Sequence, residues 1–90
     1  MRIFFPYHSV VHRKNIIGQN NRKARKNADM TQMKLAAQIQ LLGVRIDRPT
    51  IAKIELGLRP ISDIEIIAIS RILKISITSL FEGSEELFNH

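Results

Sequence analysis

The sequence predicts an all-α protein of five helices, and three observations support this prediction. Apolar residues recur at helical spacing, as at Leu35, Ile39 and Leu42, and no segment alternates apolar and polar residues as a half-buried strand does. Residues that cap helix N-termini stand before several of these segments. Hydrophobic side chains make up 44% of the 90 residues, which suits one domain with a small core and argues against a disordered chain.

The first two helices are expected on either side of a short break. The first covers residues 17–28 and carries a run of basic side chains, namely Arg22, Lys23, Arg25 and Lys26. After the break, Thr31 is a preferred N-cap residue for a second helix that runs to about Leu42. Gly43 follows as a natural C-terminal stop.

A third helix is expected to begin after Asp47, another strong N-cap residue. Pro49 falls in its first turn, where the missing N–H costs little. Gly57 ends this helix, and we expect a positive φ there.

The fourth and fifth helices follow the same logic. Ser62 and Glu65 have the spacing of a capping box and precede a helix over about residues 63–73. Ser76 then caps a short helix that ends near Leu80. The apolar faces of the five helices give an expected core of Ile17, Ala24, Met30, Leu35, Ala36, Ile39, Ile51, Ile54, Ile66, Ile69, Leu73 and Leu80.

The chain divides into an N-terminal arm over residues 1–15, a helical domain over residues 16–82 and a C-terminal tail over residues 83–90. The arm is expected to be flexible, to pack onto the domain, or to contact a partner through Arg13 and Lys14. It has no small-residue cleavage site after its apolar run, so it does not resemble a secretory signal. The tail is expected to be frayed.

Charge is distributed unevenly along the chain. Residues 1–60 carry twelve Lys or Arg and three acidic residues, whereas residues 61–90 carry two and five. A basic half points to an anionic partner, of which a nucleic-acid backbone is the most common, although a solvated surface explains the same charges. The absence of Cys excludes disulfides and cysteine-based zinc sites, and no apolar run is long enough to span a bilayer.

Two helices joined by a turn, with a basic flank, form a helix-turn-helix pattern. The residues that carry a closer match are Arg22 and Arg25, Met30-Thr31-Gln32, Leu35-Ala36, Asp47-Arg48, Thr50 through Glu55, Gly57, Arg59 and Leu80-Phe81. With these residues the chain resembles the lambda-repressor/Cro-type (xenobiotic-response-element type) helix-turn-helix family over about residues 17–82. The resemblance implies a lambda-repressor-like DNA-binding domain whose third helix enters the major groove.

Two features depart from the family's pattern. The segment between Ile39 and Asp47 is several residues longer than usual, so we expect an enlarged turn between the second and third helices. Asn21 stands in the first helix where Ile or Leu is usual. It is either tolerated at the edge of the domain, or the first helix packs loosely there.

The resemblance implies roles for individual residues. DNA base contacts fall to Arg48, Pro49, Thr50 and Lys53, and DNA phosphate contacts fall to Gln32, Arg45 and Arg59. Arg25 and Glu55 form a structural ion pair. Without the resemblance, Arg48 and Lys53 are better explained as solvated helix residues.

The fourth and fifth helices hold more apolar residues than one core face needs. The surplus is Ile64, Ile67, Ile72, Ile75 and Phe81. An exposed apolar patch usually marks an interface, and a homodimer suits a protein that reads a palindrome. Intramolecular cover by the arm, the tail or the fifth helix is the alternative.

The sequence therefore predicts a cytoplasmic, sequence-specific transcriptional regulator of double-stranded DNA, acting as a repressor by occluding a promoter. The alternative is a protein-interaction module, such as an antitoxin or an anti-regulator, that uses the Ile-rich face. Nonspecific nucleoid or RNA binding is a third hypothesis. His8 and His12 are a weak metal pair, and neither an enzyme nor a cofactor is expected.

Overall fold

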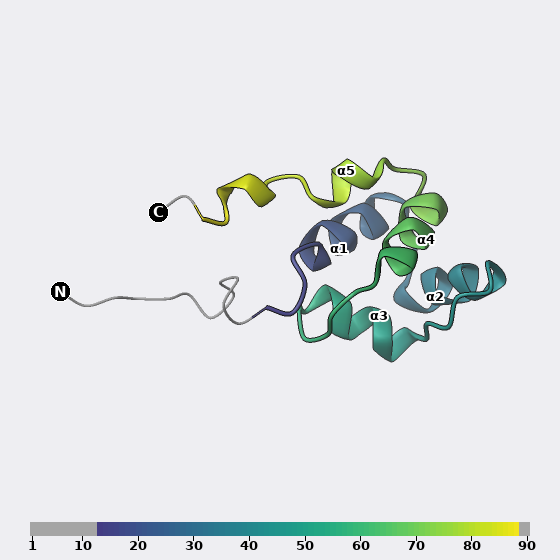
Figure 1. Ribbon diagram of the computed structural model, residues 1–90. Coiled ribbons are helices and arrows are strands. Elements are labelled where there is room, and N and C mark those ends of the chain that lie inside the picture. Colours follow the sequence, from purple (N-terminus) through teal and green to yellow (C-terminus); the bar gives the residue numbers. More distant parts are fainter. Residues whose placement is uncertain (1–12, 89–90) are drawn as a thin grey trace.

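The computed structural model describes residues 13–88, and in this part of the chain all regular structure is helical. The elements follow in the order α1 (Gly18–Asn27), α2 (Gln32–Leu41), α3 (Arg48–Glu55), α4 (Asp63–Leu73), α5 (Ile77–Leu80) and the short 3-10 helix η2 (Ser84–Glu86) (Figure 1). The expected all-α fold with five helices is confirmed. The tail differs from expectation, because η2 forms where fraying was predicted.

The predicted N-caps are confirmed. In each case the side chain accepts a hydrogen bond from the N–H of the third residue after it, at Thr31, Asp47, Ser62 and Ser76. Ser62 and Glu65 also complete the predicted capping box, because the Glu65 carboxylate accepts from the Ser62 N–H. Each cap contributes about 1 kcal/mol to helix stability.

α1 lies at the centre of the packing and contacts α3, α4 and α5, while α2 packs against α3 and α4. Figure 1 shows α3 and α5 on opposite sides of the domain, with α1 and α4 between them. The α3 side therefore presents a surface that α5 and η2 do not cover.

The core matches most of the expected residues. All of them are buried except Ala24, Met30 and Ile66, which are half-buried and pack against the core. Ile46 and Ala68 join it unexpectedly, each less than 5% exposed. Ile46 belongs to the enlarged turn, so this turn is anchored in the core. The Ile46 carbonyl also accepts a hydrogen bond of 2.6 Å from Gln40 Nε2.

The last residues of the expected arm pack onto the folded domain, which is one of the alternatives expected for it. Asn15 is buried, and its Nδ2 donates to the carbonyls of Ile54 and Arg59, at 2.9 Å each. Lys14 N donates to the Gly57 carbonyl at 2.8 Å. Residues 1–12 lie outside the described part of the chain.

The five-residue apolar patch also needs correction. Ile64 and Ile67 are exposed on the outer face of α4, at 64% and 51%. Ile72, Ile75 and Phe81 are half-buried and pack against the core. The exposed apolar face of α4 is therefore narrower than the sequence suggests. Across residues 13–88, no helix has the length and apolar character needed to cross a bilayer.

Candidate nucleic-acid interface

The outward face of α3 carries three of the four residues expected to contact bases. Ile51, Ile54 and Glu55 turn toward the interior, because they lie three and four positions apart on one side of the helix. Arg48, Pro49 and Lys53 are exposed. This places two long cationic side chains on a helix surface that nothing else in the described chain covers.

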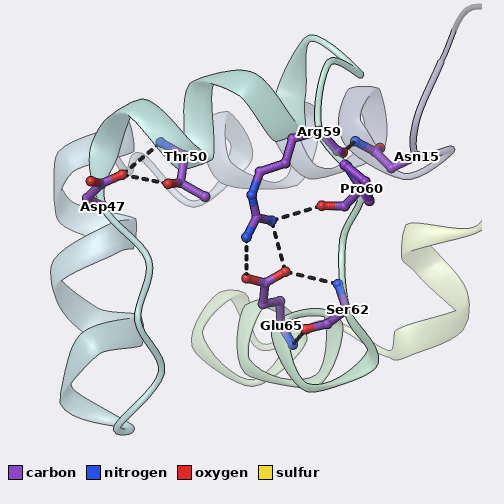
Figure 2. A network of polar contacts seen from close by, with 7 residues as sticks. All are labelled: Asn15, Asp47, Thr50, Arg59, Pro60, Ser62 and Glu65. Atoms are coloured by element: carbon purple, nitrogen blue, oxygen red, sulfur yellow. Dashed lines mark hydrogen bonds and ion pairs between the residues drawn. The ribbon is translucent and has the colours of Figure 1, made fainter.

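The fourth residue, Thr50, is half-buried and bonds to Asp47 at the leading end of α3 (Figure 2). Thr50 N and Thr50 Oγ1 both donate to Asp47 Oδ1, at 2.9 Å and 2.6 Å. These two bonds, the one from the hydroxyl first, hold the pKa of Asp47 below its usual range. Asp47 is therefore an anion at neutral pH, and it is exposed at the N-terminus of the helix.

Glu55, at the other end of α3, is the centre of a buried polar network. Its carboxylate accepts from Arg25 Nε at 2.7 Å and from Arg25 Nη2 at 3.0 Å. It also accepts from Asn21 Nδ2 at 2.9 Å and from Gln32 Nε2 at 3.0 Å. The hydrogen bond with Glu55 outweighs burial and raises the pKa of Arg25. The pair assigned to structure from the sequence thus joins α1 to α3.

Gln32 stands at the first position of α2, and Glu55 fixes how its amide is oriented. One Nε2 hydrogen is used by Glu55, so the second is left for a partner outside the network. The backbone N–H groups of the first turn of α2 lie beside it. The expected phosphate contact at Gln32 is thus compatible with the geometry, with the amide nitrogen as the donor.

Neither expectation for Asn21 is correct. Asn21 is fully buried at 0% exposure, so it is not at the edge of the domain. It does not mark loose packing either, because its Nδ2 donates to the Glu55 carboxylate. Asn21 Oδ1 finds no hydrogen-bond partner among residues 13–88. This orphaned acceptor is a cost of placing a polar side chain at an apolar position.

Arg59 has a partner for its charge inside the domain. Its Nη1 and Nη2 each donate at 3.0 Å to one oxygen of Glu65, and Nη1 also donates to the Pro60 carbonyl (Figure 2). Burial alone raises the pKa of Glu65, but the bonds from Arg59 and Ser62 together bring it below the usual range. Arg59 therefore fixes the start of α4. Its side chain stays 34% exposed, and the expected phosphate contact stays a prediction.

Arg45 is exposed on the enlarged turn, close to the leading end of α3. It lines an open hollow of about 500 Å³ together with Gln40, Gly43, Val44, Ile46, Asp47 and Thr50. The hollow separates the end of α2 from the start of α3. A turn of this size is what the long Ile39–Asp47 segment predicts.

Sequence reasoning missed Asn15 and Gly18, which bring α1 and α3 together. Asn15 Oδ1 accepts from the N–H groups of Ile17 and Gly18, at 3.1 Å and 2.8 Å. Its Nδ2 donates to the carbonyl of Ile54 in α3. A Cβ at residue 18 would overlap the carbonyl oxygen of Ile54. An Asn three residues before a Gly at a helix start is the signal that could have identified them.

Gly57 shows the positive φ predicted for it, at +75°. Among residues 13–88, no group of three acidic, His or Cys residues is placed to hold a metal ion. His8 and His12 lie outside those residues.

A family model for the helix-turn-helix domain matches residues 22–80, which is well over half of the chain. The matched region includes α2, the enlarged turn and all of α3. A search of curated proteins finds no match to this sequence. The family match and the helix arrangement agree, and the chain belongs to the lambda-repressor/Cro-like helix-turn-helix family of DNA-binding regulators.

Proposed function

We propose that this protein is a cytoplasmic transcriptional repressor that binds a specific sequence of double-stranded DNA and occludes a promoter. The observation that carries the proposal is the exposed face of α3, where Arg48 and Lys53 stand beside Pro49. Arg pairs bidentately with guanine O6 and N7 in the major groove, and Lys reaches the same acceptors. Pro49 offers only apolar contact, so base discrimination at its position is weak.

Phosphate contacts would hold α3 in register along the groove. Gln32 supplies its second Nε2 hydrogen together with the N-terminal N–H groups of α2, an arrangement that favours anions. Arg45 supplies a cation at the other edge of the recognition surface. Because Glu55 binds both Gln32 and Arg25, it fixes the phosphate-binding end of α2 relative to α3.

We also propose that two copies pair through α4, so that two α3 helices read a palindrome. Ile64 and Ile67 form the apolar centre of the exposed face. Asp63 stands at its N-terminal end, and Arg71 and Lys74 stand at its C-terminal end; all three are exposed. A two-fold axis perpendicular to α4 places the two helices antiparallel and sets Asp63 against Arg71 of the partner subunit.

The proposal is tested by selecting duplexes from a randomised pool with the wild type, Arg48→Ala and Lys23→Ala. Lys23→Ala is the matched control, because Lys23 is an exposed cation that lines the α1–α5 side, away from the face of α3. We expect the wild type and Lys23→Ala to enrich the same palindrome, and Arg48→Ala to lose one base preference in each half. Enrichment of no sequence by the wild type contradicts the proposal.

A protein-interaction role, as in an antitoxin or an anti-regulator, is the second candidate because apolar side chains remain exposed on α4. The salt dependence of binding distinguishes DNA binding from protein binding. DNA affinity falls steeply with salt, by a log–log slope of about −0.9 for each phosphate contacted. Binding of an apolar protein surface changes little over the same range.

A further inference from the structure

The two hydrogen bonds that Thr50 donates to Asp47 define what the leading end of α3 offers to a ligand. Both bonds end on Asp47 Oδ1, so they leave Oδ2 for another donor. Because the Thr50 hydroxyl has one hydrogen and gives it to Asp47, Thr50 Oγ1 can only accept further bonds. The leading end of α3 therefore presents acceptors, whereas Arg48 and Lys53 along the helix present donors.

The orientation of the carboxylate is also fixed. Bonds from a backbone N–H and a side-chain O–H of one residue hold Oδ1 in place, which in turn directs Oδ2. Asp47 is exposed, and it stands at the rim of the open hollow between α2 and α3. An ionised, oriented acceptor at the start of a DNA-reading helix favours a donor on a base edge and rejects an acceptor.

We infer that Asp47 is a specificity-determining residue that selects cytosine in each half-site, and that Thr50 positions its carboxylate. This inference rests on the proposed function. The major-groove edge of cytosine presents only the N4 amino donor. Thymine places the O4 acceptor there, and guanine places O6 and N7.

Adenine has an amino group as well, but its N7 acceptor lies beside that group and faces the same carboxylate. Cytosine is therefore the base whose major-groove edge best suits the Asp47 carboxylate. Arg48, the next residue, is a donor, so Asp47 and Arg48 together complement a cytosine and a guanine of the neighbouring pair.

The test measures affinity for the duplex that the wild type enriches and for the same duplex with one C·G pair per half-site changed to T·A. Fluorescence anisotropy is recorded for the wild type and for Asp47→Asn. Asn is an equally good N-cap, so the helix is retained, but its amide both donates and accepts. We expect the wild type to prefer C·G by about 10-fold or more and Asp47→Asn to prefer it by less than about 2-fold.

Thr50 is tested with Thr50→Val and Thr50→Ser. Val keeps the shape and the backbone N–H but removes the hydroxyl donor, whereas Ser keeps the donor. If Thr50 positions the carboxylate, Thr50→Val lowers the C·G preference without changing the preference read by Arg48, and Thr50→Ser retains it. Thermal unfolding of each variant confirms that the domain is intact.

The outcomes separate the inference from the proposed function. If the wild type enriches a motif that lacks cytosine, or if Asp47→Asn keeps the full C·G preference, the inference is overturned and the proposed function stands. If Thr50→Val keeps that preference, the positioning role is overturned. If the wild type enriches no motif at all, both the inference and the proposed function fail.

Discussion

Arg25 of α1 and Glu55 of α3 form a nearly buried ion pair, with Arg25 Nε 2.7 Å from Glu55 Oε2. Their side chains are 9% and 2% exposed. Arg25 Nη1 also donates to the Met30 carbonyl at 2.7 Å, just before α2 begins. Two side chains thus connect three helices, including both helices of the helix-turn-helix unit.

Arg25→Ala is expected to lower the free energy of unfolding by about 3–5 kcal/mol, because it leaves the Glu55 carboxylate buried without its cation. Urea unfolding followed by circular dichroism measures the loss. Arg22→Ala is the matched control. Arg22 is an exposed residue of the same helix, so its loss changes stability by less than about 0.5 kcal/mol. Equal, small effects of the two substitutions would show that the pair does not hold the helices together.

Gly18→Ala is expected to destabilise the domain by roughly 2–4 kcal/mol, since the added methyl group meets the backbone oxygen of Ile54. The oxygen belongs to α3, so relief requires the two helices to move apart. Gln19→Ala is the control, because Gln19 is an exposed neighbour in the same helix turn. A Gly18→Ala protein with wild-type stability contradicts the close approach of α1 and α3.

Stability is expected to fall with acid because Glu65 and Asp47 have lowered pKa values. A carboxyl group with a lowered pKa in the folded state contributes stability above its unfolded pKa, which is about 4. That contribution is lost as the pH falls through the folded pKa. The free energy of unfolding, measured at pH 7 and at several lower values down to about pH 3, shows the decline.

Glu65→Gln separates the Glu65 contribution from that of the other acids. It should lower stability at pH 7 and flatten the decline in acid, because the pair with Arg59 is absent at every pH. Glu85→Gln, in the exposed η2 helix, should reproduce the wild-type curve. A Glu65→Gln curve parallel to that of the wild type would refute a role for the Arg59–Glu65 pair.

Because only Ile64 and Ile67 remain exposed on the apolar face of α4, substitutions there should affect the dimer and not the core. Ile67→Ser should yield a folded monomer, because Ile67 is exposed and its side chain adds little to the packing of the core. Ile72→Ser should lower stability instead, since Ile72 packs against the core. Light scattering and thermal unfolding distinguish the two results. An Ile67→Ser protein with an unchanged dimer mass would exclude α4 as the interface.

Local signals in the sequence predicted much of this fold. Thr31, Asp47, Ser62 and Ser76 mark helix starts because a cap bonds only to a residue three positions away. The family resemblance, in turn, predicts that α3 is the helix that reads DNA. These features depend on neighbours in the chain, so the order of residues is sufficient to find them.

Contacts between distant residues were harder to predict. Asn15 binds Ile54 across 39 positions, and Asn21 binds Glu55 across 34. The Arg59–Glu65 pair was not predicted either, because it forms across the loop between α3 and α4. Which charge is paired inside the domain depends on the path of this loop, and spacing alone does not reveal it.

The central claim is that the exposed face of α3 reads a DNA sequence, and a ratio of affinities tests it most directly. The measurement compares the dissociation constants of the wild type and Lys53→Ala for the enriched duplex and for a scrambled duplex, at one physiological salt concentration. We expect the wild type to prefer the enriched duplex by at least about 1,000-fold. The preference of Lys53→Ala should be about 10-fold smaller, since the substitution removes one base contact. Equal wild-type affinity for the two duplexes would contradict the account.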